Sequence, residues 1–393
     1  MMHIAVPTYA AHVLDLLTRA GYEAFVVGGC VRDSLLGRTP DDWDITTSAL
    51  PQETITALGD IRTLETGIKH GTITALIDGN PVEITTYRVD GSYSDNRRPD
   101  HVSFTRSMRE DLARRDFTVN ALAYSSAAGV IDYFGGMEDL SKRVLRCVGN
   151  PELRFHEDAL RIMRALRFAA TLGFSIERET AGSLRRNCAL LDHIAAERLC
   201  SELMRLLCGA HAAEILCSYP EVIARLIPAL PACSGALARV EPTPVLRLAM
   251  LLMPLSAQDA AAALAGLRYD NATRRAVKAL LTHRTAQVES TKPAIRRWLN
   301  RLGEQPLRDL LAVKAACGED VFAAQAILNE VIQSNDCWTL KALAVNGSDL
   351  QALGIPAGKP LGDALQALLD AVIDGELPND RDLLLQKIKR PQN

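Results

Sequence analysis

The sequence contains no apolar run approaching the roughly 18 uncharged residues that a membrane-spanning helix needs. Its first residues, Met1–Ala20, have the pattern of an amphipathic helix with Asp15 and Arg19 in it, not the basic-then-apolar layout of a signal peptide. We therefore expect a cytoplasmic protein with no membrane partner.

Cysteine pairs and excess charge are also missing. The nine cysteines are odd in number and none has C-x-x-C spacing, so neither a disulfide framework nor a zinc site is indicated, and buried free thiols are expected. The net charge is −3, which argues against a protein that coats nucleic acid with its whole surface. A nucleic-acid partner would have to bind a local basic surface.

No internal repeat and no low-complexity segment organises the 393 residues, which are too many for one ordinary core. The composition changes after Gly149: mixed α/β patterning gives way to helical periodicity that is rich in Ala and Leu and punctuated by proline. The predicted fold class is α+β, with an N-terminal α/β head containing a small mixed sheet, followed by an elongated all-helical remainder.

Four strands are expected in the head. Apolar or alternating patterns predict them at residues 24–27, 42–47, 72–77 and 82–87, and Asp78-Gly79-Asn80 is a strong hairpin signal between the last two. A helix is expected to begin near Cys30. The polar, turn-rich segment 90–99 is typical of a mobile loop.

Three carboxylates stand out in these strands. Asp42 and Asp44 are two residues apart, so on a strand they would share one face, and Glu83 interrupts an apolar and Thr-rich strand. Oxygen ligands of this kind suit Mg²⁺, and three carboxylates could hold two ions about 4 Å apart for phosphoryl transfer. A solvated strand edge is the alternative, because short spacing motifs often occur by chance.

A glycine pair precedes these carboxylates in the chain. Gly28 and Gly29 follow a predicted strand and precede a helix, so backbone N–H groups can approach a triphosphate. Arg32, one turn into that helix, can add charge-assisted hydrogen bonds to the same phosphates.

Five motifs in order resemble those of the class II tRNA CCA-adding enzymes, relatives of bacterial poly(A) polymerases among the polymerase-β-like nucleotidyltransferases. The motifs are Val27–Gly37 with Asp42–Ile45, then Arg114–Ala121, Asp132–Gly136, Glu157–Arg161, and Glu197–Arg198 leading into Ser201–Leu203. The match covers about the first 210 residues closely, and the tail more loosely around Leu343–Leu350.

The resemblance implies an enzyme that adds C and A to the 3′ end of tRNA from CTP and ATP with two Mg²⁺ ions, without a template. It implies sugar and triphosphate contacts by Arg115, Asp116 and Asn120, a flexible third motif, and a nucleobase-reading fourth motif. The corresponding domains are a catalytic head (1–142), a neck (143–207), a body (208–275) and a tRNA-binding tail (276–393).

The fourth motif suggests how C and A could be chosen. Carboxylates only accept hydrogen bonds and guanidinium groups only donate them. Asp158 could accept from the exocyclic amino group and Arg161 could donate to the ring nitrogen that C and A share, whereas G and U present the opposite order. An ordinary surface pair of Asp158 and Arg161 is the alternative. Glu157, Arg161 and Arg164 are spaced to share a helix face, and Arg164 and Arg167 either reach the nucleotide or are solvated.

Basic residues are concentrated in the helical part. Residues 143–205 contain eleven arginines and eight acidic residues, so this segment is locally basic. A second group, which is either a phosphate-binding surface or a solvated face, comprises Arg274, Arg275, Lys278, Arg296, Arg297 and Arg301.

Three other functions stay open at this stage. A poly(A) polymerase shares the head motifs, although Gly67-Ile68-Lys69-His70-Gly71-Thr72 is similar to the segment of CCA-adding members. An enzyme that adds only CC or only A is a narrower variant. The full-length loop 90–102, with Arg97-Arg98, favours completion with A. An inactive RNA-binding protein would not need the intact carboxylates. The sequence leaves monomer and homodimer open.

Overall fold

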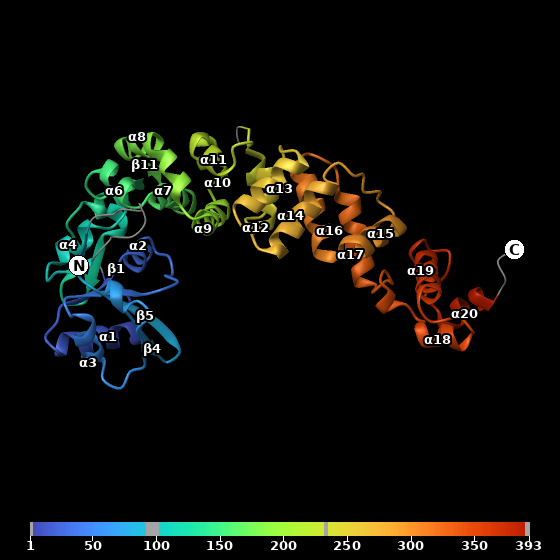
Figure 1. The fold of residues 1–393 in the computed structure, drawn as a ribbon, viewed down its shortest axis with the longest axis horizontal. Helices are drawn as coiled ribbons and strands as arrows, with labels where there is room; N and C mark the ends of the chain where they lie inside the picture. Colours follow the sequence, from blue (N-terminus) through green and yellow to red (C-terminus); the bar gives the residue numbers. More distant parts are fainter. Residues whose placement is uncertain (1–2, 92–101, 232–234, 390–393) are drawn as a thin grey trace. The chain divides into compact units, whose positions relative to one another are not determined.

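The computed structural model describes residues 3–91, 102–231 and 235–389. Two compact units make up the chain: Met1–Cys233 together with Gly266–Arg268, and Ser234–Ala265 together with Tyr269–Asn393. The boundary between the two units lies near residue 233. The finer division into head, neck, body and tail stays a prediction. The expected α+β class is confirmed, because the β-sheet lies near the N-terminus and helices make up nearly all of the rest (Figure 1). No helix in the described part of the chain has the length and apolar character needed to cross a membrane.

A seven-stranded mixed sheet forms the centre of the first unit, in the order β3-β4-β5-β2-β1-β8-β9. Only the β2–β5 pairing is parallel among the neighbours in this sheet. The strands of this unit are β1 Ala24–Val27, β2 Asp44–Thr47, β3 Thr63–Leu64, β4 Thr72–Ile77, β5 Asn80–Thr86, β6 Arg88–Asp90, β7 Val102–Phe104, β8 Leu122–Ser125, β9 Gly129–Asp132, β10 Val144–Leu145 and β11 Ser175–Ile176.

The predicted hairpin between β4 and β5 is confirmed. Ile77 pairs with Asn80, which leaves Asp78 and Gly79 as a two-residue loop, and both have positive φ (50° and 80°). Such a loop matches the twist of the flanking strands.

Helices cover both faces of the sheet. One face packs on α1 Thr8–Arg19 and α3 Pro51–Leu58 through residues such as Val26 and Ile45 (Figure 1). Val27, the next residue of β1, points to the opposite face and packs with Tyr87 and Leu112. The remaining helices of this unit are α2 Gly29–Leu35, α4 Met108–Ala113, α5 Gly136–Lys142, α6 Pro151–Glu157, α7 Leu160–Leu172, α8 Arg178–Asn187, α9 Ala196–Leu207, α10 Ala212–Ser218 and α11 Pro220–Leu226, with 3₁₀ turns at Ile68–His70, Thr118–Asn120 and Cys188–His193.

The second unit is helical throughout its described residues. Its helices often begin with a side-chain cap: Asp270 accepts from the N–H groups of Ala272 and Thr273, and Asn346 caps α18. The helices are α12 Pro244–Leu252, α13 Ala257–Gly266, α14 Asn271–His283, α15 Lys292–Leu302, α16 Glu304–Ala316, α17 Phe322–Gln333, α18 Gly347–Ala352, α19 Lys359–Ile373 and α20 Arg381–Lys389, with 3₁₀ turns at Gly235–Arg239 and Leu340–Ala342. The cysteines among the described residues are free, as expected, but the expectation that they are buried is wrong for Cys217 and Cys317, which are exposed.

Candidate active site

One polar cavity of about 560 Å³ in the first unit collects the sequence-predicted site residues. All of them except Glu83 line it: Gly28, Gly29, Arg32, Asp42, Asp44, Arg115, Asp116, Asn120, Asp158, Arg161, Arg164 and Arg167. The structure therefore brings together residues that are up to 139 positions apart in the chain.

The turn between β1 and α2 forms one wall. Gly28 has φ 83° and ψ −126°, and a Cβ built on it would lie 2.9 Å from Nη1 of Arg115. A side chain at this position would be strained and would displace the guanidinium. The glycine therefore allows Arg115 to lie directly against the backbone of the turn.

The carboxylates differ in one respect from the prediction. The strand begins at Asp44, not at Asp42, because the pairings of β2 with β1 and β5 extend only to Ile45 and Asp44, respectively. Asp42 is thus an exposed residue of the preceding loop, although it lines the same cavity as Asp44. Glu83 lies beside Asp44 in the β2–β5 register.

Negative charge is concentrated at Asp44. Burial, followed by the charges of Asp42 and Glu83, raises the pKa of Asp44 to about 6, while Arg115 acts in the opposite direction. An all-oxygen donor set with an excess of negative charge fits a hard divalent cation. No group of three or more His, Cys, Asp or Glu side chains in the described residues is already arranged around a common metal position, so Glu83 as a third ligand stays a prediction.

The second motif supplies a buried polar network. Asp116 forms an ion pair with Arg164 at 2.6 Å and accepts a hydrogen bond from Asn120 at 3.0 Å. Burial opposes ionisation of Asp116, but Arg164 and the hydrogen bond from Asn120 outweigh it and lower the pKa to about 2. Asn120 in turn accepts from Nη1 of Arg32. These contacts fix Arg32 and Arg164 at the cavity wall.

An aromatic ring that the sequence analysis did not single out organises three of these arginines. The guanidinium carbons of Arg32, Arg164 and Arg167 lie 5.0, 5.3 and 3.8 Å from the ring centroid of Phe168. Phe168 follows Arg161 and Arg164 at helical spacing on α7, which is the signal that could have identified it.

The fourth motif does not form one continuous helix, so the predicted shared face of Glu157, Arg161 and Arg164 is wrong. Helix α6 ends at Glu157 and α7 begins at Leu160, with extended backbone at Asp158 (φ −140°, ψ 102°). Oδ1 of Asp158 accepts from the Leu160 N–H at 3.0 Å, and this side-chain bond replaces a helical one.

Asp158 and Arg161 have different ion-pair partners. Asp158 pairs with Arg198 at 3.0 Å, and Arg161 pairs with Glu157 at 2.6 Å. Arg161 also donates to the carbonyl of Arg114 at 2.8 Å. The simple surface pair of Asp158 with Arg161 is therefore not what the structure contains, and both side chains line the cavity.

No individual role was assigned from the sequence to the other residues of the cavity wall, although Asp33, Arg114, Leu160 and Arg198 lie within the motifs. These other residues are Asp33, Asp41, Arg114, Leu160, Phe168, Arg198 and Arg205. The excess of arginine in the neck indicated a basic surface but not which arginines turn inward. Residues 92–101, which include Arg97-Arg98 of the predicted specificity loop, lie outside the described residues.

Comparison with known proteins agrees with this site. Residues 24–146 match the family model of the poly A polymerase head domain, and residues 245–388 match tRNA nucleotidyltransferase domain 2. The CCA-adding enzyme of Lactiplantibacillus plantarum is 38% identical, with 96% of this chain and 94% of that protein covered. The CCA-adding enzyme of Geobacillus thermodenitrificans is also 38% identical, over 95% and 94%.

A solved structure agrees as well. The crystal structure of the Bacillus stearothermophilus CCA-adding enzyme in complex with CTP is similar with a TM-score of 0.81 at 33% identity, covering 97% of this chain and 96% of that one. The chain therefore belongs to the family of CCA-adding enzymes, which are tRNA nucleotidyltransferases.

Proposed function

We propose that this protein adds C, C and A to the 3′ end of tRNA, using CTP and ATP, in the cytoplasm. The 3′-oxygen of the tRNA forms a bond to the α-phosphorus of the nucleotide, the bond to pyrophosphate breaks, and the hydroxyl proton leaves to solvent. One observation carries the proposal: a single cavity combines a carboxylate pair, a glycine turn, clustered arginines and a polar pair suited to a base edge.

The triphosphate is proposed to lie between the glycine turn and the arginines. Gly28 and Gly29 offer backbone close to Arg115, while Arg32 and Arg167 line the same cavity. Asp116 and Asn120 hold Arg164 and Arg32 through the bonds described above. Their proposed contribution is orientation of the α-phosphorus, since positioning supplies much of the rate in such reactions.

Asp42, Asp44 and Glu83 are proposed to hold two Mg²⁺ ions. When bound, these ions would lower the pKa of the 3′-hydroxyl and stabilise the charge on the leaving pyrophosphate. The raised pKa of Asp44 supports this assignment, because burial and then the charges of Asp42 and Glu83 disfavour its ionised form, and a bound cation would offset both effects.

Base choice is proposed to rest on Asp158 and Arg161. In the structure their polar atoms already bind Arg198, Glu157 and the carbonyl of Arg114. These partners orient each side chain at the cavity, and a base would share or replace some of the bonds. Unpaired polar groups against G or U would cost about 1–3 kcal/mol each.

The division of labour along the chain is part of the proposal. Residues 1–142 would carry the chemistry, 143–207 base choice, and 208–275 with 276–393 the tRNA contacts. The relatives support tRNA as substrate, because one solved structure of a Thermotoga maritima CCA-adding enzyme with the same fold is complexed with tRNA. The proposal holds for a monomer and for a homodimer.

A poly(A) polymerase is the second candidate, because the head of the chain matches the poly A polymerase family model. The test is incubation of the purified protein with Mg²⁺ and a tRNA ending at the discriminator base. Addition of two C from CTP, followed by one A from ATP, is the expected result. A long A tail from ATP alone would establish the polymerase, and addition limited to one nucleotide type would establish a CC-only or A-only enzyme.

A further inference from the structure

Asp111 on α4 is a completely buried carboxylate outside the motif residues considered above. Its exposed fraction is 0%, and it does not line the active-site cavity. Burying an isolated carboxylate is costly unless it is paired and hydrogen-bonded. The contacts that stabilise it therefore indicate what it does.

The partners of Asp111 come from β2, from β6 and from the residues that directly follow α4. The backbone N–H of Arg88 on β6 donates to Oδ1 at 3.4 Å. Oδ1 accepts from Nε and Nη2 of Arg114 at 3.0 and 2.8 Å. Oδ2 accepts from Oγ1 of Thr46 at 3.0 Å and lies 3.8 Å from Nη2 of Arg115. Thr46 is on β2, two residues after Asp44.

Each partner leads to a different part of the proposed substrate. Arg115 packs against Gly28 at the proposed triphosphate position. The carbonyl of Arg114 accepts from Nη2 of Arg161, the proposed base reader. The Nε of Arg115 is buried without a hydrogen-bond partner among the described residues, so the position of this guanidinium depends on its charged neighbours, Asp111 first and then Asp44 and Asp116.

We propose that Asp111 is a positioning residue that fixes the spacing between the phosphate-binding Arg115, the base-reading Arg161 and the carboxylate strand β2. This inference rests on the proposed function. Since the carboxylate is fully enclosed, it touches no substrate atom and acts through the residues that it contacts. Arg114, Arg115 and Thr46 are the side chains among them, and the backbone N–H of Arg88 also donates to it.

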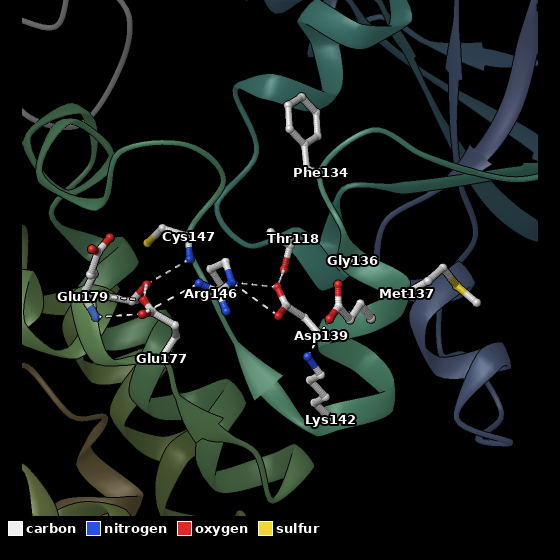
Figure 2. Close-up of polar contacts among 12 residues, drawn as sticks. Thr118, Phe134, Gly136, Met137, Asp139, Lys142, Arg146, Cys147, Glu177 and Glu179 are labelled. Atoms are coloured by element: carbon white, nitrogen blue, oxygen red, sulfur yellow. Dashed lines mark hydrogen bonds and ion pairs between the residues drawn. The ribbon is translucent and has the colours of Figure 1, made fainter.

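The chain offers a closely matched control. Asp139 on α5 is also buried, with 5% exposed, and also binds a threonine and an arginine: it accepts from Oγ1 of Thr118 at 2.7 Å and pairs with Arg146 at 3.1 Å (Figure 2). Arg146 also reaches Glu177 at 3.7 Å. None of these four residues lines the cavity.

The experiment compares Asp111→Asn with Asp139→Asn. Steady-state kinetics are measured for CTP on tRNA ending at the discriminator base and for ATP on tRNA ending in CC, with UTP and GTP as competitors. Asp111→Asn is expected to raise KM for CTP and ATP about tenfold and to lower the preference over UTP and GTP about tenfold, because a charged hydrogen bond is lost. Asp139→Asn is expected to lose a similar amount of stability while both quantities stay unchanged.

A milder variant covers the case in which Asp111→Asn does not fold. Thr46→Val removes one donor to Asp111 and keeps the shape of the side chain, and it should give the same pattern more weakly. Wild-type KM and selectivity in a folded Asp111→Asn or Thr46→Val variant would overturn the proposal, as would an equal change in Asp139→Asn.

Calorimetric titration with CTP alone distinguishes failure of the proposed tRNA extension from failure of the proposed positioning by Asp111. If the wild-type protein binds CTP but does not extend tRNA, the proposed function fails. Positioning by Asp111 is then still decided by whether CTP binding weakens in Asp111→Asn but not in Asp139→Asn.

Discussion

Gly28 illustrates how one residue can determine the geometry of a site. Its positive φ and its closeness to Arg115 impose two separate demands, which both follow from the absence of a Cβ. Gly79 in the β4–β5 hairpin has a similar φ of 80°, but a Cβ there would have no atom within 4 Å. A side chain at Gly79 would therefore cause backbone strain alone, whereas a side chain at Gly28 would cause the same strain and also crowd the active site.

Gly28→Ala is expected to destabilise the protein by about 1–3 kcal/mol and to raise KM for CTP and ATP, because the new methyl group displaces Arg115. Gly79→Ala should lose comparable stability with no change in KM. Thermal unfolding and steady-state kinetics check both. An unchanged KM in a folded Gly28→Ala variant would contradict the proposed placement of Arg115 at the triphosphate.

Asp42→Asn and Asp44→Asn are each expected to reduce nucleotide addition by roughly a hundredfold to a thousandfold, because each would weaken the binding of the cations that stabilise the transition-state charge. Removal of Mg²⁺ with EDTA should have at least as large an effect on the wild-type protein. Single-turnover rates with tRNA and CTP provide the measurement. Asp15→Asn serves as the comparison and should keep the wild-type rate, since Asp15 pairs with Arg19 on α1 and does not line the cavity. Nucleotide addition by Asp42→Asn and Asp44→Asn at near the wild-type rate would contradict the assignment of these carboxylates as metal ligands.

Asp116 makes stability depend on acid pH. Its pKa falls from the ordinary 3.8 to about 2 in the folded protein, so the unfolded chain takes up the proton first as pH falls. The stabilisation, about 2 kcal/mol, is complete above pH 4 and is lost as pH falls through 2.

Asp116→Asn should therefore remove part of the pH dependence of the unfolding free energy between pH 4 and pH 2. Urea unfolding followed by the fluorescence of Trp43 measures it, with Trp298 and Trp338 replaced by Phe, because two units need not unfold together. Asp349→Asn, in the second unit, should leave this transition unchanged. Equal slopes for the wild-type protein and Asp116→Asn would refute the pairing energy assigned to Arg164.

At the scale of elements, four strands of the sheet and one hairpin turn were predictable, whereas β3, β8, β9 and the helix break were not. Residues 24–27 and 72–77 form strands as predicted, because side-chain alternation and turn chemistry are local properties. Glu157 and Arg161 are four residues apart, a spacing typical of an ion pair within one helix. In the structure the pair forms across the break between α6 and α7. Whether a carboxylate caps the next turn, as Asp158 does, depends on geometry that periodicity does not encode.

Tertiary packing explains the other omissions. Asp111 precedes Arg114 and Arg115 at ordinary helical spacing and would pass for a surface residue. It is buried because β2 supplies Thr46 from a distant part of the sequence. Phe168 likewise resembles a core residue until three arginines gather over its ring. Motif residues could be predicted individually, whereas the residues that join the motifs could not.

The α6–α7 junction predicts a selectivity defect. Asp158→Asn replaces one acceptor with an amide that can also donate, so addition of U should rise and addition of C should fall, each by about tenfold. Primer extension with CTP and UTP in competition measures the ratio. Asp192→Asn removes a more exposed aspartate–arginine pair, with Arg225, in the same unit but away from the cavity, and it should not change the ratio. A C-to-U ratio equal to that of the wild type in Asp158→Asn would contradict base reading by this residue.

At the scale of the whole molecule, the cations of the second unit fall into two groups: those paired with carboxylates and those without such a partner among the described residues. Arg296 pairs with Asp336 and Arg297 with Asp374, so these two predicted phosphate contacts are neutralised. Arg274, Arg275 and Lys278 line a cavity of about 460 Å³ between α13 and α14. No carboxylate lies within ion-pair distance of these three in the described part of the chain.

This unpaired charge predicts a contact with tRNA phosphates in a protein whose net charge is −3. Replacing Arg274, Arg275 and Lys278 together by Gln should raise KM for tRNA while KM for CTP stays unchanged. Each phosphate contact contributes about 0.7–0.9 to the slope of log affinity against log salt, so the slope should fall by up to about 2–3. Arg381→Gln removes an exposed arginine that is already paired with Asp349, and it should leave the slope unchanged. A triple variant with the wild-type salt dependence would mean that these cations form only a solvated helix face.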